Sequence, residues 1–225
     1  LRIEVTLNSN DNAAIFHGLH HQSEPLRLPN AWDAGSALLI ERLGADAIAT
    51  TSAGVAWSLG YRDGDALPLD RHLASVAAIA RVISVPLSVD IEAGYTDDEA
   101  EMARTTARFI EAGAVGINIQ DGAGTPDLLC RKIEQARETA ERLGIRLYIN
   151  ARTDVYARAL AAAGDRVKEV LARARQYRDA GADGLFVLGV TDRAEIREIA
   201  KGTELLLNVI AWPGLPAATE LSALG

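Results

Sequence analysis

The amino-acid sequence predicts an α/β protein: a (β/α)8 TIM-type barrel whose eighth unit is missing from this chain. Residues 26–224 repeat one pattern, in which a short apolar strand ending in polar residues or glycine is followed by an amphipathic helix. Three of the expected helices end in a similar phrase just before the next strand, namely LGADAI (43–48), AGAVGI (112–117) and AGADGL (180–185). Alternating strands and helices are typical of a parallel sheet covered by helices.

Seven strands are expected, over residues 26–31, 47–51, 86–93, 116–121, 147–153, 184–189 and 205–211. A helix over residues 10–22 precedes them, and the connecting helices carry apolar residues at three-to-four spacing, as Met102, Phe109 and Ile110 do. The helix-like PAATELSALG follows the seventh strand, and the chain stops where an eighth strand would begin. We therefore expect residues 1–225 to form a single barrel domain with a truncated C-terminal end.

An open doubly wound sheet is the alternative arrangement for the same pattern of elements. That fold usually carries a G-x-G-x-x-G turn after its first strand. The corresponding stretch here, PNAWDAGS (29–36), lacks this glycine spacing. The barrel is therefore the favoured prediction.

Composition narrows the class of function. The 31 acidic and 23 basic side chains give a net charge of −8, which favours neither a nucleic-acid partner nor an anionic membrane. No apolar run reaches the roughly 18 residues that a membrane-spanning helix needs. The one cysteine, Cys130, permits no disulfide framework, so we expect a reducing, cytoplasmic location.

The four histidines are not predicted to belong to a functional site. His17, His20 and His21 form an H-x-x-H-H cluster on the expected N-terminal helix, where a surface or interface cluster is favoured over a zinc site because no further ligands are evident nearby. His72 begins another helix, and we expect it to be solvated.

Polar side chains gather at the carboxyl ends of the expected strands. Because side chains alternate along a strand, residues of one parity share a face. The shared polar faces carry Ser88, Asp90 and Glu92 on the third strand, Asn118 and Gln120 on the fourth, Asn150 and Arg152 on the fifth, and Asn208 on the seventh. Barrel enzymes keep their active sites at this end of the strands, so an active site is predicted there.

The residue types in this set suit a divalent cation and a carboxylate substrate. Asp90 is the best direct ligand for Mg²⁺, with Mn²⁺ as a second possible ion, while Glu92, Gln120 and Asp63 would act directly or through water. The Arg152 guanidinium suits a substrate carboxylate, and the loop TTSAG (50–54) offers backbone N–H groups. The alternative is a salt-bridged layer in which Arg152 neutralises Asp90 without a metal.

A run of motifs resembles the isocitrate lyase/phosphoenolpyruvate mutase superfamily, in its short-loop, carboxyphosphonoenolpyruvate-mutase-like branch. The motifs are LPNAWDAGSA (28–37), ATTSAGVAWSLGYRDGD (49–65), DIEAGYTDD (90–98), INIQDG (117–122), INARTDVY (149–156) and LNVIAWPG (207–214). The resemblance implies a (β/α)8 barrel, a homotetramer with swapped C-terminal helices, Mg²⁺, and substrates with a 2-oxocarboxylate or enolate core.

The resemblance also implies roles for individual residues. Thr51, Ser52 and Ala53 fall where the family binds the substrate carboxylate, and Asn208 falls on a late substrate contact. Asp90 and Glu92 match a D-x-D-x-G-Y metal motif. Gln120 replaces a family Glu. Asp63 falls on an acid of the second loop and Arg152 on a substrate-binding Arg, so these two are our catalytic candidates. The predicted metal set is Asp90, Glu92 and Gln120.

Departures from the family pattern restrict the activity. Glu92 stands where Asp is usual, Gln120 removes one negative charge, and QDGAGTPDLLC (120–130) lacks both the K-[KR]-C-G-H loop of the lyases and the Lys and Asn of the mutases. Cys130 comes too late to replace the missing acid and is expected to be a core residue. We therefore predict a Mg²⁺-dependent lyase-type enzyme for a 2-oxocarboxylate, with decarboxylation or another step that needs little protein acid.

Three other classes of protein share some of these features. A keto-acid-binding barrel that has lost its chemistry stays open, since a fold alone does not establish activity. A Schiff-base aldolase needs a lysine at a strand end, but Lys132, Lys168 and Lys201 all fall in helical stretches. A phosphate-binding isomerase barrel is a poor match because AWPGLP (211–216) is not glycine-rich.

Overall fold

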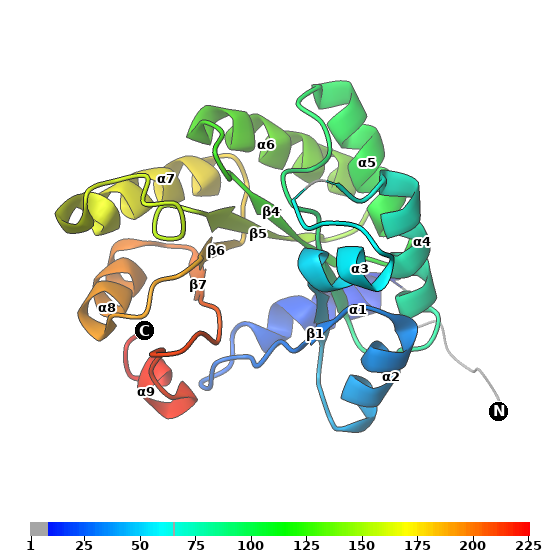
Figure 1. Cartoon of the computed structure of the whole chain (residues 1–225), viewed down its shortest axis with the longest axis horizontal. Helices are drawn as coiled ribbons and strands as arrows, with labels where there is room; N and C mark the ends of the chain where they lie inside the picture. The colour runs from blue at the N-terminus through cyan, green and yellow to red at the C-terminus, as the bar shows by residue number, and fades with distance from the viewer. Residues whose placement is uncertain (1–8, 65) are drawn as a thin grey trace.

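The computed structural model describes residues 9–64 and 66–225, which form a curled sheet of seven parallel strands covered by helices (Figure 1). The strands follow one another across the sheet in chain order, and in the described residues no pairing closes the sheet between the last strand and the first. They are β1 (Asn30–Ala31), β2 (Ile48–Thr50), β3 (Leu87–Asp90), β4 (Gly116–Gln120), β5 (Tyr148–Thr153), β6 (Gly184–Val187) and β7 (Leu206–Asn208).

This architecture confirms the predicted barrel with a missing unit: the sheet is a half-barrel. A doubly wound sheet would reverse its strand order at a switch point, and the observed order does not reverse, so that alternative is wrong. The strands are shorter than expected at both edges of the sheet. Only Asn30–Ala31 of residues 26–31 and Leu206–Asn208 of residues 205–211 are regular strand, because an edge strand has a neighbour on one side only.

The helices follow the predicted alternation. They are α1 (Ser9–Leu19), α2 (Ala34–Arg42), α3 (Ser52–Ser58), α4 (Leu69–Ala80), α5 (Glu99–Glu111), α6 (Pro126–Arg142), α7 (Arg166–Asp179, after the short 3₁₀ turn Ala163–Asp165), α8 (Arg193–Gly202) and α9 (Ala218–Ser222). Side-chain caps begin several of them; Asp98 accepts a hydrogen bond from the Glu101 N–H at 2.8 Å at the start of α5. No helix among the described residues is long and apolar enough to cross a membrane.

The core lies between the sheet and its helices. Alternate strand residues point outward into it and are fully buried, among them Val89, Ile117, Ile119, Ile149 and Leu185. Their neighbours in sequence, including Asn118 and Asn150, face the concave side and are only half-buried. This confirms the expected division into an apolar outer face and a polar inner face.

Helix α1 packs across the end of the sheet at which the strands begin. Ala13 and Phe16 join a small apolar cluster with Ala47, Val115 and Tyr148 from the starts of the strands. His17 is buried there, with its Nε2 3.1 Å from the Arg146 carbonyl oxygen, and His20 stacks on Tyr148 at 4.1 Å between ring centroids. The expected surface cluster is therefore wrong for His17, while His21 is exposed as expected.

His72 is a second correction, because its side chain is buried rather than solvated. It lies on α4, with Nδ1 2.7 Å from the Tyr95 hydroxyl and its ring edge-on to Phe109. Burial lowers the pKa of His72 to about 4, although the nearby Asp90 carboxylate opposes that shift. The folded protein therefore holds this imidazole neutral.

His72 should make the free energy of unfolding depend on pH. Its pKa is about 4 in the folded state against 6.5 in the unfolded chain, so between these values the unfolded chain binds the extra proton. Stability is then fully present above pH 6.5 and falls as the pH drops toward 4, by at most about 1.4 kcal/mol per pH unit. We expect His72→Asn to flatten this slope in urea titrations from pH 4 to 7.

His21→Asn is the matched control, because it removes an exposed imidazole and should keep the wild-type slope. His17 and His20, whose pKa values are also lowered by burial, contribute equally to all three proteins. An H72N slope identical to that of the wild type would show that His72 does not titrate in this range.

Candidate active site

The centre of the predicted site is the Asp90 carboxylate at the end of β3. Its Oδ2 accepts hydrogen bonds from the Ser52 hydroxyl (2.8 Å) and the Ser52 N–H (3.3 Å), and its Oδ1 accepts from the Glu92 N–H and the Asn118 amide, both at 3.2 Å. All four donors are neutral. The carboxylate is thus fixed in orientation while its negative charge has no cationic partner among the described residues.

A row of asparagines links Asp90 across the concave face of the sheet. The Asn150 amide donates both to Asn118 Oδ1 (3.2 Å) and to Asn208 Oδ1 (3.1 Å), so strands β3, β4, β5 and β7 are joined by side chains. Gly184 on β6 makes room for the row, because a Cβ there would lie 2.7 Å from Asn150 Oδ1. The predicted inward faces therefore meet as the parity of the strands required.

Arg152 lies two residues after Asn150, on the same face of β5, and is held by a partner that was not predicted from the sequence. Its Nε donates to Asp154 Oδ1 at 2.7 Å, and the Asp154 carboxylate also accepts from Arg158 Nε at 3.0 Å. No ion pair joins Arg152 to Asp90 within residues 9–64 and 66–225. The alternative in which Arg152 neutralises Asp90 is therefore wrong.

Asp154 is itself anchored to the outer helices through Asp121. Asp121 Oδ1 accepts the Asp154 N–H at 2.9 Å, and Oδ2 accepts from Arg173 Nη1 and the Tyr177 hydroxyl, each at 2.7 Å. Burial and then the Asp121 carboxylate raise the pKa of Tyr177, so it donates as a neutral phenol. Burial opposes the Arg173 charge, but the bonds to Glu169 and Asp121 outweigh it and raise the pKa of Arg173.

This second network could have been suspected from the sequence only in part. Asp154 stands two residues after Arg152 in INARTDVY, the spacing that places two residues on one side of a strand. The contact of Asp121 with α7, 52 residues further along at Arg173, has no signal in the sequence.

Residues 51–53, predicted as a loop, form the N-cap and first residues of α3, and their backbone N–H groups are only partly available to a ligand. The Thr51 N–H donates to the Ala31 carbonyl at 3.2 Å, and the Ser52 N–H is used by Asp90. Of the three backbone donors predicted for a substrate carboxylate, only that of Ala53 makes no hydrogen bond to a described residue. The start of α3 therefore positions Asp90 through Ser52.

Of the remaining predicted site residues, one takes part through its side chain in the hydrogen-bond network around Asp90 and two do not. Gln120 pairs in register with Arg152, and its side-chain amide makes no hydrogen bond to the described residues. Asn208 belongs to the asparagine row. Asp63 is exposed and outside the hydrogen-bond network formed by the described residues, so its catalytic role stays a prediction.

Glu92 follows β3 in a conformation that few residues adopt. Its φ is +53°, and Gly94 and Tyr95 are also left-handed at +88° and +67°. A left-handed residue other than glycine costs about 1–3 kcal/mol, which the surroundings must offset. The turn ends the strand at Asp90, earlier than the predicted residue 93, and buries the Glu92 side chain.

The predicted metal ligands Asp90, Glu92 and Gln120 would offer oxygen atoms, which hard cations prefer, and together they carry only two negative charges. In the part of the chain that the structure describes, no cluster of three His, Cys, Asp or Glu side chains could hold a metal ion. The predicted set of two carboxylates and one amide would leave such an ion with waters or substrate oxygens as further ligands, as Mg²⁺ prefers. The unneutralised Asp90 carboxylate is the observation that favours a cation here.

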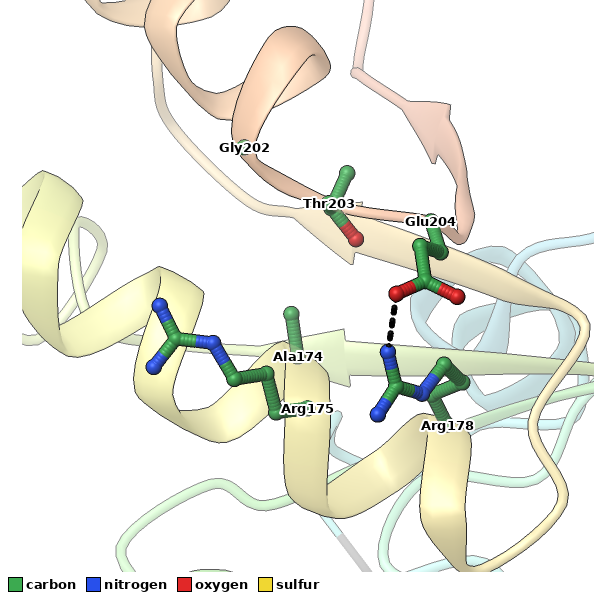
Figure 2. A pocket seen from close by; sticks show the side chains of 6 residues that line it. All are labelled: Ala174, Arg175, Arg178, Gly202, Thr203 and Glu204. Atoms are coloured by element: carbon green, nitrogen blue, oxygen red, sulfur yellow. Dashed lines mark hydrogen bonds and ion pairs between the residues drawn. The ribbon is translucent and has the colours of Figure 1, made fainter.

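A small hollow at the opposite end of the sheet does not belong to this site. Figure 2 shows it between α7 and the segment before β7, lined by Ala174, Arg175, Arg178, Gly202, Thr203 and Glu204, with Arg178 and Glu204 ion-paired across it. Thr203 and Glu204 precede the start of β7, whereas Asp90 and Arg152 lie toward the ends of their strands.

A family model and individual proteins of known sequence both match this chain over most of its length. The family described as phosphoenolpyruvate phosphomutase matches residues 16–225. An uncharacterised protein of Mycobacterium tuberculosis is 38% identical over 214 residues, which cover 93% of this chain and 78% of that protein. The 2-methylisocitrate lyase of Escherichia coli is 33% identical over 214 residues, covering 91% of this chain and 72% of the enzyme.

A solved structure supports the same relationship. The crystal structure of a putative phosphonomutase from Burkholderia cenocepacia superposes with a TM-score of 0.91 at 39% sequence identity. The superposition covers 96% of this chain and 90% of that one. The half-barrel described above is therefore shared with this relative over nearly the whole chain.

Asp154 should control how well Arg152 binds an anionic ligand. Asp154→Asn removes the charge that orients the Arg152 Nε, so the guanidinium loses its fixed position. We expect the affinity for oxalate, measured by calorimetry, to fall about tenfold, which corresponds to ~1.4 kcal/mol.

Arg158→Gln is the control, because it removes the half-exposed second partner of Asp154 and leaves the Arg152 contact in place. Oxalate affinity should change less than about twofold in this variant, as is usual for exposed ion pairs. Equal losses in D154N and R158Q would contradict a specific role for Asp154.

Proposed function

The chain belongs to the phosphoenolpyruvate phosphomutase family, and from that premise we propose that it is a Mg²⁺-dependent lyase-type enzyme acting on a 2-oxocarboxylate. The observation that carries this proposal is the Asp90 carboxylate, which is held by four neutral donors and lacks a cationic partner among the described residues. A bound cation would supply the missing positive charge.

Asp90, Glu92 and Gln120 would hold the ion, directly or through water. When bound, the ion acts as a Lewis acid that polarises the substrate carbonyl. Ser52 and Asn118 keep the Asp90 carboxylate in one orientation, so little reorganisation is required during the reaction.

Arg152 would bind the substrate carboxylate. Its Nε is occupied by Asp154, while its two terminal nitrogens make no hydrogen bond to the described residues and are available to an anion. A guanidinium fixed at one nitrogen in this way is pre-oriented for a two-point contact with a carboxylate. The Ala53 N–H and Asn208 would contribute further contacts, and Asp63 is proposed to act from the second loop.

The reaction that fits best needs little acid from the protein. Cys130 lies on α6, partly buried against the core, and burial raises its pKa to about 11, so the thiol is a poor proton donor. This confirms its predicted place in the core. Cleavage of the bond to C3 with release of CO₂, an aldehyde or a phosphorus group is therefore proposed, with decarboxylation favoured.

A keto-acid-binding protein without turnover is the second candidate. Gln120 in place of the family Glu favours it, because the amide brings no negative charge to the ion. By the resemblance described above we also propose a homo-oligomer, a tetramer in the family pattern, and the single thiol favours a cytoplasmic location.

Asp90→Asn should abolish the Mg²⁺-dependent reaction. The variant keeps the size of the side chain but removes the negative charge, so the ion should no longer bind. The measurement is turnover of oxaloacetate, phosphonopyruvate and larger 2-oxo acids with Mg²⁺ or Mn²⁺, together with calorimetry of oxalate binding in the presence and absence of the ion.

Asp46→Asn, at an exposed carboxylate near the start of β2, is the control and should behave as the wild type. Full turnover in D90N would exclude the proposed mechanism. Metal-dependent oxalate binding by the wild type without turnover of any substrate would select the binding protein instead.

A further inference from the structure

The loop that joins β3 to α5, residues 91–98, carries Glu92 and is held in an unusual shape. Three of its residues have left-handed backbones, and a Cβ on Gly94 would lie 2.9 Å from the Met102 sulfur, so the turn is packed tightly against α5. Such a turn keeps its shape only if the structure around it supplies fixed contacts.

One of these contacts comes from a buried lysine. Lys132 lies on α6, and its side chain is only 7% exposed. Its ammonium group donates to the Ala93 carbonyl at 2.8 Å and to Asp97 Oδ1 at 2.7 Å, so one cation ties together the residue after Glu92 and the residue before the Asp98 cap. Helix α6 packs along α5 (Figure 1), and the two hydrogen bonds of Lys132 join α6 to the loop that precedes α5.

The other contacts of the loop lie on either side of this one. The Gln120 N–H donates to the Glu92 carbonyl at 2.9 Å, and the Tyr95 hydroxyl meets His72 on α4. Between them, the Ala93 carbonyl has Lys132 as its partner. The Gly94 N–H also donates to the Ile91 carbonyl at 2.9 Å. Loss of the ammonium would therefore leave the Ala93 carbonyl and the Asp97 carboxylate without this partner, and the turn would be held by fewer contacts.

We propose that Lys132 is a positioning residue: by clamping the Ala93 carbonyl and Asp97 it fixes the backbone that presents Glu92 to the cation site beside Asp90. This inference rests on the proposed function, because it takes Glu92 to be part of a metal site. Lys132 itself touches neither Asp90 nor Arg152, and its effect passes through the loop.

The test compares three variants of the full chain. Lys132→Met keeps the apolar stem without the charge, Lys132→Arg restores donors, and Lys201→Met removes an exposed lysine as the control. Two quantities are measured: the Kd for Mn²⁺ by calorimetry, and backbone hydrogen exchange of residues 92–97 in metal-free protein.

We expect K132M to raise the Kd for Mn²⁺ at least tenfold, the effect typical of groups that orient metal ligands, and to speed exchange in residues 92–97. K132R should recover most of both properties, and K201M should match the wild type. Wild-type exchange in K132M, or faster exchange with an unchanged Kd, would overturn the proposal. A wild-type protein that binds no Mn²⁺ would instead overturn the proposed function. In that case the hydrogen-exchange data would still test whether Lys132 holds residues 92–97 in place.

Amine labelling of the wild type tests the clamp even if K132M does not fold. Lys168 and Lys201 are exposed and should react first, whereas Lys132 should react only when the loop opens. Because metal binding and loop closure favour each other, Mn²⁺ should slow the labelling of Lys132 alone. Labelling of Lys132 as fast as that of Lys201 would contradict the proposal, and so would a rate indifferent to Mn²⁺ in protein that calorimetry shows to bind the ion.

Discussion

The Asp90 carboxylate carries its charge at the rim of the half-barrel with hydrogen bonds from neutral groups only. Ser52 contributes two of these bonds, and Asn118 and the Glu92 N–H contribute the others. Placing a charge in a partly buried position is costly unless something compensates it. Neutral donors fix the carboxylate without cancelling its charge, so the arrangement suits a site that receives a cation.

The side chains beside Asp90 on the concave face are polar, as a carboxylate held by hydrogen bonds requires. The interior of a closed barrel is usually filled by branched aliphatic side chains, but here Asn118, Asn150 and Asn208 form a polar row that ends at Asp90. Amides suit this position because they can donate to the carboxylate and accept from the next amide along the row. Gly184 removes the side chain that would otherwise occupy the space beside Asn150.

Two cations at or beside the site, Arg152 and Lys132, are each paired with an acid other than Asp90. Asp154 holds Arg152, and Asp97 with the Ala93 carbonyl holds Lys132. Asp154 is in turn fixed by Asp121, which is paired with Arg173 on α7. Arg152 and Lys132 are thus paired with other acids, and neither forms an ion pair with Asp90 among the described residues. Hydrogen bonds thus connect α6 to the loop after β3, and they connect α7 to Asp154 beside Arg152 through Asp121.

The sequence by itself determined the order of the seven strands and their helices and the inward face of Asp90, Asn118, Asn150 and Arg152, because chain-local periodicity sets all of these. It did not determine the partners of those side chains. Burial of His72, the clamp by Lys132 and the Asp121–Arg173 pair join residues 23 to 52 positions apart. Only the tertiary structure decided these contacts, since the distance between such residues depends on how whole helices pack against the sheet, and neighbouring residues in the chain carry no record of that packing.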